Sequence, residues 1–577
     1  MHTVISSARV IALTTVALMV FAGCKRPDPT PPPQSKPESA GPVSAEAKTS
    51  ADQITGDYLR AQITKLSSDE FEGRGPATPG DTKARDYLVE QLKQIGFEPG
   101  GPDGGWQQTF DVVGVKADMP KQWSFKKGAK TVSFKWWDQY IAGSGVQNEK
   151  GAIDNAEVVF VGYGIQAPEY GWDDFKGKDL KGKVLLMLNN DPDWDPSLFA
   201  GNTRLYYGRW VYKYESAARQ GAAGAIIIHT TPSAGYPFQV VQTSWSGEQF
   251  ELPAESEPRI QAKGWLTEDA ARQLVALSGN DLDKLIQSAK SKDFTPVPLG
   301  VTTSLSFKNK LNRASTANVY GVLKGSDPQL ASEYVIYSAH HDHLGIGAPD
   351  KNGDKIYNGA MDNASGVAQL LAMGKAFKAL PTPPKRSVML LFVAAEEQGL
   401  LGSGYYSKHP SVAPGKIAAN INYDGGNIWG RSKDLVFVGK GKSSLDAIVD
   451  AVAQTQGRVV TPDQFPDRGH FYRSDQFSFA KIGVPALDVG TGTDFIGRPA
   501  GWGKEQREAY EQNNYHQPSD EIKDTWNFEG MVEDAQLGFW VGVDVANEAA
   551  MPAWVAGDEF EAARKAALDS VPSGKTE

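Results

Sequence analysis

The sequence has almost no cysteine and no excess of positive charge. Cys24 is the only cysteine among 577 residues, so the chain cannot form an internal disulfide. There are 59 Lys and Arg against 69 Asp and Glu, a formal net charge of −10, which argues against a nucleic-acid partner. Beyond the N-terminus no segment approaches the roughly 18 apolar residues of a membrane-spanning helix. With 40% hydrophobic and 22% charged residues, the composition is that of a globular protein.

The one long apolar run and the one cysteine lie together at the N-terminus. Residues 10–23 have the length of a signal peptide and end at Cys24. Residues 21–24 (FAGC) resemble the lipobox of bacterial lipoproteins, which implies a lipoprotein-type signal peptide over residues 1–24 and a lipid on the cysteine. Lys25 after the cysteine favours the outer membrane, so the expected place is the bacterial cell envelope, facing the periplasm. A secreted protein is the alternative.

The remainder of the chain divides by composition. Residues 25–50 are rich in Pro, Ser and Lys and have little to bury, which predicts a disordered tether. A chain of this length is expected to form at least two folded units. We expect one domain from residues 51–115 together with 300–550, an inserted domain with its connecting segments at 116–299, and a C-terminal tail at 551–577.

Apolar periodicity predicts the secondary structure. Helices are expected at residues 51–66, 81–95, 211–220, 364–380 and 443–456. Strands are expected at residues 158–163, 184–188, 225–228, 305–311, 315–323, 334–339, 387–395, 417–423, 435–438 and 486–489. Strands that alternate with helices beyond residue 300 predict an α/β fold, in which helices sandwich a mixed, mostly parallel sheet.

Side chains that bind metal ions follow the predicted strands. His340 follows residues 334–339, Glu396 and Glu397 follow 387–395, and Asp424 follows 417–423. The ends of strands are where α/β sheets place their sites. A pair of Zn²⁺ ions needs two histidines, a bridging carboxylate and one further carboxylate for each ion. The chain supplies this set, with Tyr515 beside the last member: His340, Asp362, Glu397, Asp424 and His516.

Neighbouring residues in these clusters are expected to differ in role. Strand alternation places His340 and Asp342 on one face and His341 on the other, which favours His340 as the ligand and lets Asp342 orient its ring. The adjacent Glu396 and Glu397 can face different ways, so that one binds metal and the other handles a proton. Without the other motif residues, each of these carboxylates would be read as a solvent-exposed side chain, because most Asp and Glu residues are exposed.

Several motifs, in chain order, resemble those of peptidase family M28, the co-catalytic zinc aminopeptidases. They are SAHHDHLG (338–345), GAMDNASGV (359–367), AEEQGLLGS (395–403), NYD (422–424), SDQF (474–477), GVPA (483–486) and YHQPSD (515–520). The resemblance implies the zinc exopeptidase fold and two Zn²⁺ ions. It implies that His340, Asp362 and Asp424 hold one ion, and that Asp362, Glu397 and His516 hold the other. It also implies Glu396 as the general base and Tyr515 as a hydrogen-bond donor to the oxyanion.

The inserted region has a resemblance of its own. Residues 158–165 (VVFVGYGI), 178–184 (KDLKGKV) and 221–225 (GAAGA) resemble a β-rich protease-associated (PA) domain, a non-catalytic insert of several peptidase families. The loop at residues 68–74 is typical of M28 members that carry this insert. His229 in the insert has no partner nearby in sequence, so we expect a core or surface histidine rather than a ligand.

The expected function is that of a two-zinc exopeptidase acting on peptides. The resemblance implies removal of N-terminal amino acids by attack of a metal-bridging water, with Glu396 as base. The alternatives are a carboxypeptidase or a glutaminyl cyclase-like acyl-transfer enzyme on the same fold, or a non-catalytic binding protein. The insert argues against a cyclase, and the complete ligand set argues against a non-catalytic protein. Peptides are the expected partners, with membrane contact only through the lipid.

Overall fold

The computed structural model describes residues 43–571. The predicted signal peptide, Cys24 and residues 25–42 of the predicted tether lie outside this range. Within it, none of the helices combines the length and apolarity needed to cross a membrane.

The C-terminal half is built on a mixed, mostly parallel sheet, as the sequence predicts. β17 (Ser387–Val393), β14 (Tyr334–His340), β18 (Ile417–Asn422) and β21 (Ala486–Gly490) are parallel neighbours in this order. β13 (Val297–Leu323) is antiparallel to β17 at one side, while β19 (Asp434–Val438) is antiparallel to β21 at the other and parallel to β20 (Val459–Pro462). All residues of β17 and β18 are buried, which explains why these strands read as continuous apolar runs.

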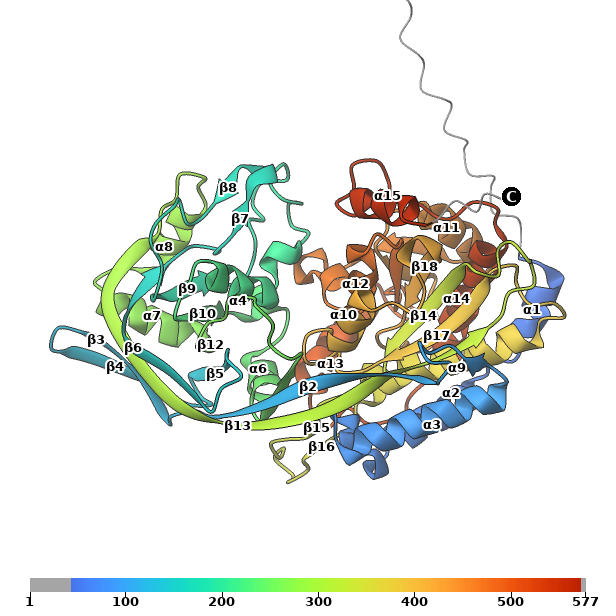
Figure 1. Cartoon of the computed structure of the whole chain (residues 1–577), viewed down its shortest axis with the longest axis horizontal. Coiled ribbons are helices and arrows are strands. Elements are labelled where there is room, and N and C mark those ends of the chain that lie inside the picture. Colours follow the sequence, from blue (N-terminus) through green and yellow to red (C-terminus); the bar gives the residue numbers. More distant parts are fainter. Residues whose placement is uncertain (1–42, 572–577) are drawn as a thin grey trace, which may run out of the picture. The chain divides into compact units, whose positions relative to one another are not determined.

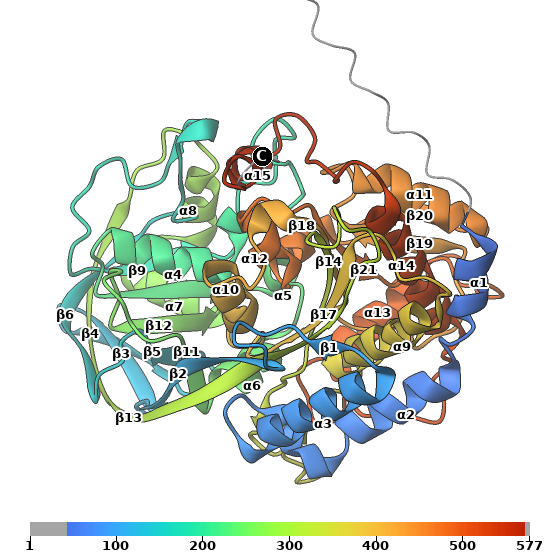
Figure 2. The same ribbon diagram turned by 45° about the vertical axis from the view of Figure 1, so that its right-hand side comes forward.

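Helices cover both faces of this sheet (Figure 2). Alternate residues of β14 and β17 pack into two different hydrophobic clusters, one on each face. The first cluster involves α2 (Gly56–Leu66), α3 (Pro79–Ile95), α9 (Ser365–Ala379), α11 (Leu445–Thr455) and α14 (Glu529–Asn547). The second involves α10 (Leu401–Lys408) and α12 (Gln476–Lys481). The predicted sandwich of helices around the sheet is therefore confirmed.

The region between β2 (Gln107–Asp118) and β13 has a core of its own. β9 (Val184–Leu188), β10 (Gly224–His229) and β12 (Ala262–Thr267) are parallel, and β6 (Lys150–Phe160) and β5 (Tyr140–Ser144) flank them. Helices α4 (Trp210–Arg219), α6 (Phe238–Trp245), α7 (Glu268–Leu277) and α8 (Leu282–Ala289) and the hairpin of β3 (Gln122–Lys127) and β4 (Lys130–Lys135) complete it. We call residues 119–296 the insert region.

Two long strands connect the insert region to the C-terminal half. β2 and β13 pair over 12 positions, from Gln107 with Val319 to Asp118 with Lys308, and Figure 1 shows them as one long curved pair. The prediction of two separate strands at residues 305–311 and 315–323 is wrong at this point. The polar residues between them are exposed, but they continue the pairing with β2, so the backbone remains one strand.

Both ends of the described chain are more ordered than predicted. Residues 45–50 belong to helix α1 (Ala45–Ala51), not to a tether, because Ala47 and Ala51 are buried and Trp540 Nε1 donates to the Ala47 carbonyl at 3.1 Å. The helix expected at residues 51–66 starts only at Gly56, where Thr55 caps α2. In the predicted tail, Trp554 and Phe560 are buried and α15 (Glu561–Asp569) contributes Arg564, which bonds the Ile417 carbonyl at 2.9 Å.

Candidate metal centre

The carboxyl ends of three parallel strands bring the polar motifs together. β14 ends at His340, Glu396 follows β17, and Asp424 follows β18. Asp362 joins them from the turn before α9, in a segment held by the carboxylate of Asp520, which accepts from the backbone N–H groups of Met361 and Asp362 at 3.1 Å each. Adjacent parallel strands end at one edge of a sheet, so residues far apart in sequence meet there.

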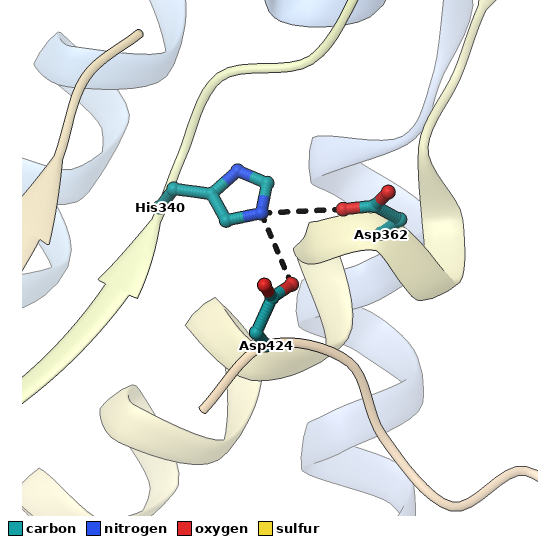
Figure 3. A group of neighbouring side chains, drawn as sticks. All are labelled: His340, Asp362 and Asp424. Atoms are coloured by element: carbon teal, nitrogen blue, oxygen red, sulfur yellow. Dashed lines mark hydrogen bonds and ion pairs between the residues drawn. The ribbon is translucent and has the colours of Figure 1, made fainter. Parts of the chain in front are cut away.

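His340 lies between two carboxylates (Figure 3). Its Nε2 atom is 3.2 Å from Asp362 Oδ1 and 3.2 Å from Asp424 Oδ1. Its Nδ1 atom contacts the Asp342 carbonyl oxygen at 3.2 Å. The Asp342 carboxylate is 3.7 Å from Nδ1 and accepts the backbone N–H of Glu396 at 3.0 Å. Asp342 thus links the end of β14 to the segment that carries the glutamates.

A second group of ligand atoms shares Asp362 with the first. His516 Nε2 is 3.3 Å from Asp362 Oδ2 and 2.9 Å from Glu397 Oε2. His343, to which the sequence analysis assigns no role, places Nδ1 2.7 Å from Glu397 Oε1. Potential ligand atoms lie within 4.8 Å of one another in three sets: His340, Asp362 and Asp424; His340, Glu396 and Glu397; His343, Asp362 and Glu397.

The two adjacent glutamates have opposite electrostatic surroundings. Burial raises the pKa of the Glu396 carboxyl well above its usual value, and the charges of Asp424 and Glu397 add to the increase against the effect of His340. Burial acts in the same direction on Glu397, but the neighbouring His516 and His343 outweigh it and lower its pKa to about 2. The adjacent side chains of Glu396 and Glu397 therefore differ strongly in proton affinity.

Two buried residues from the N-terminal segment support these loops, and the sequence reasoning assigned neither a role. Arg74 Nε donates to the His341 carbonyl at 2.8 Å, and its other nitrogens donate to the carbonyls of Asn358 and Gly359 at 2.7 and 2.9 Å. Asp81 Oδ1 lies 3.1 Å from His341 Nε2, so His341 points away from His340, as strand alternation predicts. The available signal was the loop at residues 68–74, which contains this arginine.

The insert region also reaches the site. Ser244 Oγ on α6 is 2.7 Å from His516 Nδ1, and Gln239 Nε2 on the same helix donates to Gln517 Oε1 at 2.9 Å. No motif in the sequence marks Ser244. By contrast, His229 contacts the Tyr236 carbonyl at 3.1 Å and packs against Trp265, which agrees with a core histidine.

The cluster has the composition of a metal site. Asp362, Glu396, Glu397 and Asp424 have no ion pair with Lys or Arg within residues 43–571, and their neighbours are imidazoles. Carboxylates packed this closely and largely removed from water need a cation to offset their mutual repulsion. Within residues 43–571, His343 Nε2 is buried without a hydrogen-bond partner. Imidazole nitrogens and carboxylate oxygens are ligands that suit Zn²⁺.

Two cavities meet at this cluster. The first, of about 140 Å³, is lined by Asp362, Glu396, Asp424 and Tyr515 and by an apolar group of side chains: Trp429, Val436, Val438, Phe465 and Val489. His470 and Arg473 also line it, so the loop at residues 466–473 contributes to the pocket. The second, of about 250 Å³, shares Glu396, Glu397, Arg473 and Tyr515 and extends towards α4.

Comparisons with known proteins agree with this geometry. Residues 318–538 match peptidase family M28. The chain is 27% identical over 267 residues to a probable leucine aminopeptidase 2 of Aspergillus oryzae, which covers 43% of this chain and 47% of that protein. It is 26% identical over 251 residues to aminopeptidase YwaD of Bacillus subtilis, which covers 43% of this chain and 48% of the relative. These alignments span about half the length of each relative.

Two matches extend over most of the chain. A probable lipoprotein aminopeptidase, LpqL, of Mycobacterium tuberculosis is 23% identical over 536 residues, 89% of each chain. The structure of an aminopeptidase from Aneurinibacillus sp. strain AM-1 superposes with a TM-score of 0.51 over 88% of this chain and 97% of the other, at 19% identity. The second match shows a shared fold. The family match shows that residues 318–538 are similar to peptidase family M28.

Proposed function

We propose that this protein is a two-zinc exopeptidase that removes N-terminal amino acids from peptides. The observation that carries the proposal is that Asp362 faces His340 through one oxygen and His516 through the other. A carboxylate placed between two ligand groups is the arrangement that a pair of metal ions requires. The aminopeptidase names of the relatives support the same activity.

The residues divide into two ligand groups. His340, Asp362 and Asp424 would hold one Zn²⁺, and Asp362, Glu397 and His516 the other. His343, at 2.7 Å from Glu397, would orient this glutamate or take a place in the second group. When bound, zinc ions lower the pKa of water and polarise the scissile carbonyl, so the protein needs no nucleophilic side chain of its own.

Glu396 is the proposed general base. Its carboxylate lies 4.0 Å from His340 Nε2 and lines both cavities, so it faces the space in which a substrate carbonyl and a water would meet. Because burial and neighbouring carboxylates raise its proton affinity, Glu396 is suited to accept a proton from water and to pass it to the leaving amine.

Tyr515 is the proposed donor to the oxyanion of the tetrahedral intermediate. Its ring stacks on His516 with centroids 3.9 Å apart, which fixes its position beside the ligands. Arg473 Nη2 donates to the Tyr515 oxygen at 3.2 Å, so the hydroxyl proton is free to be donated elsewhere. Burial raises the pKa of Tyr515 well above its usual value, which keeps this proton in place at neutral pH.

The first cavity favours an apolar N-terminal residue. Its aliphatic and aromatic side chains lie beside Asp424 and Glu396, whose carboxylates would accept hydrogen bonds from a free ammonium group. A substrate with a bulky apolar first residue and a free amine satisfies both parts of this pocket.

The test is hydrolysis of aminoacyl amides and p-nitroanilides by the purified protein. We expect turnover of leucine derivatives with a free amine, loss of turnover after chelation, and recovery with Zn²⁺. Glu396→Gln should reduce kcat by roughly 100- to 10,000-fold and retain its metal. Glu505→Gln on the exposed face of α13 (Trp502–Asn513) is the matched control. A protein that binds two metal ions per chain and hydrolyses none of these compounds would refute the proposal.

We also propose a location and a domain assignment. A lipid on Cys24 would hold the protein in the bacterial cell envelope, and Lys25 after the cysteine favours the outer membrane. The relative named as a lipoprotein supports this location. Cys24→Ser should move the protein from the membrane fraction to the soluble fraction. Residues 116–299 would be a PA domain inserted between the two parts of the catalytic domain, 51–115 and 300–550.

A further inference from the structure

The second cavity begins at the metal centre and leads to the insert region. It shares Glu396, Glu397, Arg473 and Tyr515 with the first cavity, so the two meet at the reacting groups. Its far wall is formed by Arg209, Trp210 and other residues of the insert region. At about 250 Å³ it is smaller than the pocket of a drug-sized ligand, which suits a short end of a peptide rather than a long chain.

Arg209 enters this cavity without a partner. It precedes α4 as its N-cap residue, and no side chain of the described part of the chain caps this helix end. Among the described residues, the Arg209 guanidinium makes no hydrogen bond and no ion pair, and the half-buried side chain lines the cavity. Burial, together with the positive charges of Arg473 and Arg204, lowers its pKa to about 10. An unpaired guanidinium beside the positive end of a helix is suited to an anion.

Arg473 adds a second guanidinium. It donates to the Tyr515 hydroxyl at 3.2 Å and lies over the Tyr236 ring at 5.6 Å, but it forms no ion pair with a carboxylate within residues 43–571. The charge of Glu511 acts on Arg473 from beyond ion-pair distance, and Arg473 lines both cavities where they meet.

The carboxylates of this cavity have other partners. Glu397 is close to His516 and His343, and Glu396 is the proposed base. Glu215 accepts from the Tyr206 hydroxyl at 3.1 Å and lies beside Arg219 at 3.8 Å and near Lys481. Lys408 is a further cation of the lining. Arg209 and Arg473 are therefore the guanidinium groups of this lining, and neither forms an ion pair with a carboxylate within residues 43–571.

We propose that Arg209 and Arg473 bind the free carboxylate of the residue that follows the scissile bond, so that dipeptides are the preferred substrates. This inference rests on the proposed exopeptidase activity. The apolar cavity takes the first residue, the metal centre takes the scissile carbonyl, and the second cavity takes a second residue that ends in a carboxylate. The insert region thereby selects substrates, because it supplies one of the two arginines.

The experiment compares kcat/KM for Leu-Ala, Leu-Ala amide, Leu-Glu amide and Leu-Gln amide. A charged hydrogen-bonded pair contributes about 1.5–3 kcal/mol, so we expect Leu-Ala to exceed its amide by roughly 10- to 100-fold. Arg209→Met should reduce this ratio to near one, Arg209→Lys should give an intermediate ratio, and Arg272→Met should leave it unchanged. Arg272 is the matched control because it lies in the insert region on α7, in a surface ion pair with Glu268 at 2.6 Å.

The outcomes separate this proposal from the proposed function. Hydrolysis of Leu-Ala amide and leucine p-nitroanilide reports the exopeptidase activity and also shows that each variant is folded. An equal rate on Leu-Ala and its amide, or a ratio that Arg209→Met does not change, would overturn the carboxylate site while leaving the activity in place. An Arg209-dependent preference for Leu-Glu amide over Leu-Gln amide, without a preference for Leu-Ala, would assign the arginines to an acidic side chain instead and refute the dipeptide proposal. Absence of turnover on all substrates would refute both.

Discussion

Both halves of the molecule contain parallel strands and buried carboxylates, but different groups offset the negative charge of these carboxylates. In the insert region, Asp174 accepts hydrogen bonds from the Ile165 backbone and the Trp172 indole at 2.9 and 3.0 Å, and the fully buried Lys213 supplies a positive charge. In the C-terminal half, Asp362, Glu397 and Asp424 face one another across imidazoles and have no lysine or arginine ion pair within the described range. A buried acid that already has backbone or indole donors and a lysine beside it is structural, whereas one that faces only imidazoles and other carboxylates is a candidate metal ligand.

The metal content of purified variants is the most direct test of this difference between the carboxylates of the two halves. Asp424→Asn should lose bound metal and reduce activity by at least about 100-fold, because it removes a carboxylate that the cluster offers to a cation. Asp191→Asn, the matched change in the insert region, should keep its metal, because this carboxylate accepts the Leu205 N–H at 2.8 Å and lies near Lys213. Metal analysis of both purified variants measures the difference, and equal losses would contradict it.

Removing the cation of the insert region should reduce stability and leave metal content unchanged. Lys213 donates to the carbonyls of Tyr163 and Asn190 at 2.5 and 2.7 Å, so Lys213→Met leaves buried acceptors and the acids Asp174 and Asp191 without their positive charge. We expect a loss of roughly 3 kcal/mol in the free energy of unfolding, measured by urea denaturation. Lys213→Met with Asp174→Asn should recover part of the loss. A stable Lys213→Met protein would show that the acids of the insert region do not depend on this lysine.

The insert region should also respond to acid through His229. Burial lowers the pKa of this histidine to about 4, against an ordinary value near 6.5. The neutral form is favoured in the folded state, so its contribution is complete above pH 6.5 and is lost as the pH falls from there towards 4. Between pH 7.5 and pH 5 we expect a loss of about 2 kcal/mol in unfolding free energy. His229→Gln should remove this part of the pH dependence, and an unchanged slope would contradict the assignment.

The smallest expected effect concerns the contact between the two halves. Ser244→Ala removes the hydroxyl at 2.7 Å from His516 Nδ1, which would otherwise fix the orientation of the ring. We expect roughly tenfold weaker metal binding, because partners of ligating histidines contribute on this scale. Metal titration of the metal-free protein measures the change, with Ser246→Ala as the control. Equal affinities of both variants and the unmodified protein would show that the insert region does not support the ligand.

The elements that local periodicity defines were predicted well. β9 and β14 agree closely with the runs at residues 184–188 and 334–339, and α9 with 364–380, because buried strands and packed helices leave strong apolar patterns. The failures are where long-range pairing overrides the local pattern. β13 continues through exposed polar residues because β2 pairs with it, and α1 folds from a tether-like sequence because its alanines pack in the core.

The sequence by itself predicted most strands and helices from their apolar runs. It predicted the candidate ligands because His340, Glu397 and Asp424 follow such runs and because Asp362 and His516 lie in motifs that resemble those of a peptidase family. Only the tertiary structure decided which distant residues support them. Arg74 reaches the His341 carbonyl across 267 positions, and Ser244 reaches His516 across 272. Arg209 likewise meets Arg473 in a cavity that no motif marks. The reason is physical: periodicity reports which side of an element is buried, whereas the contacts between elements depend on how the chain packs in three dimensions.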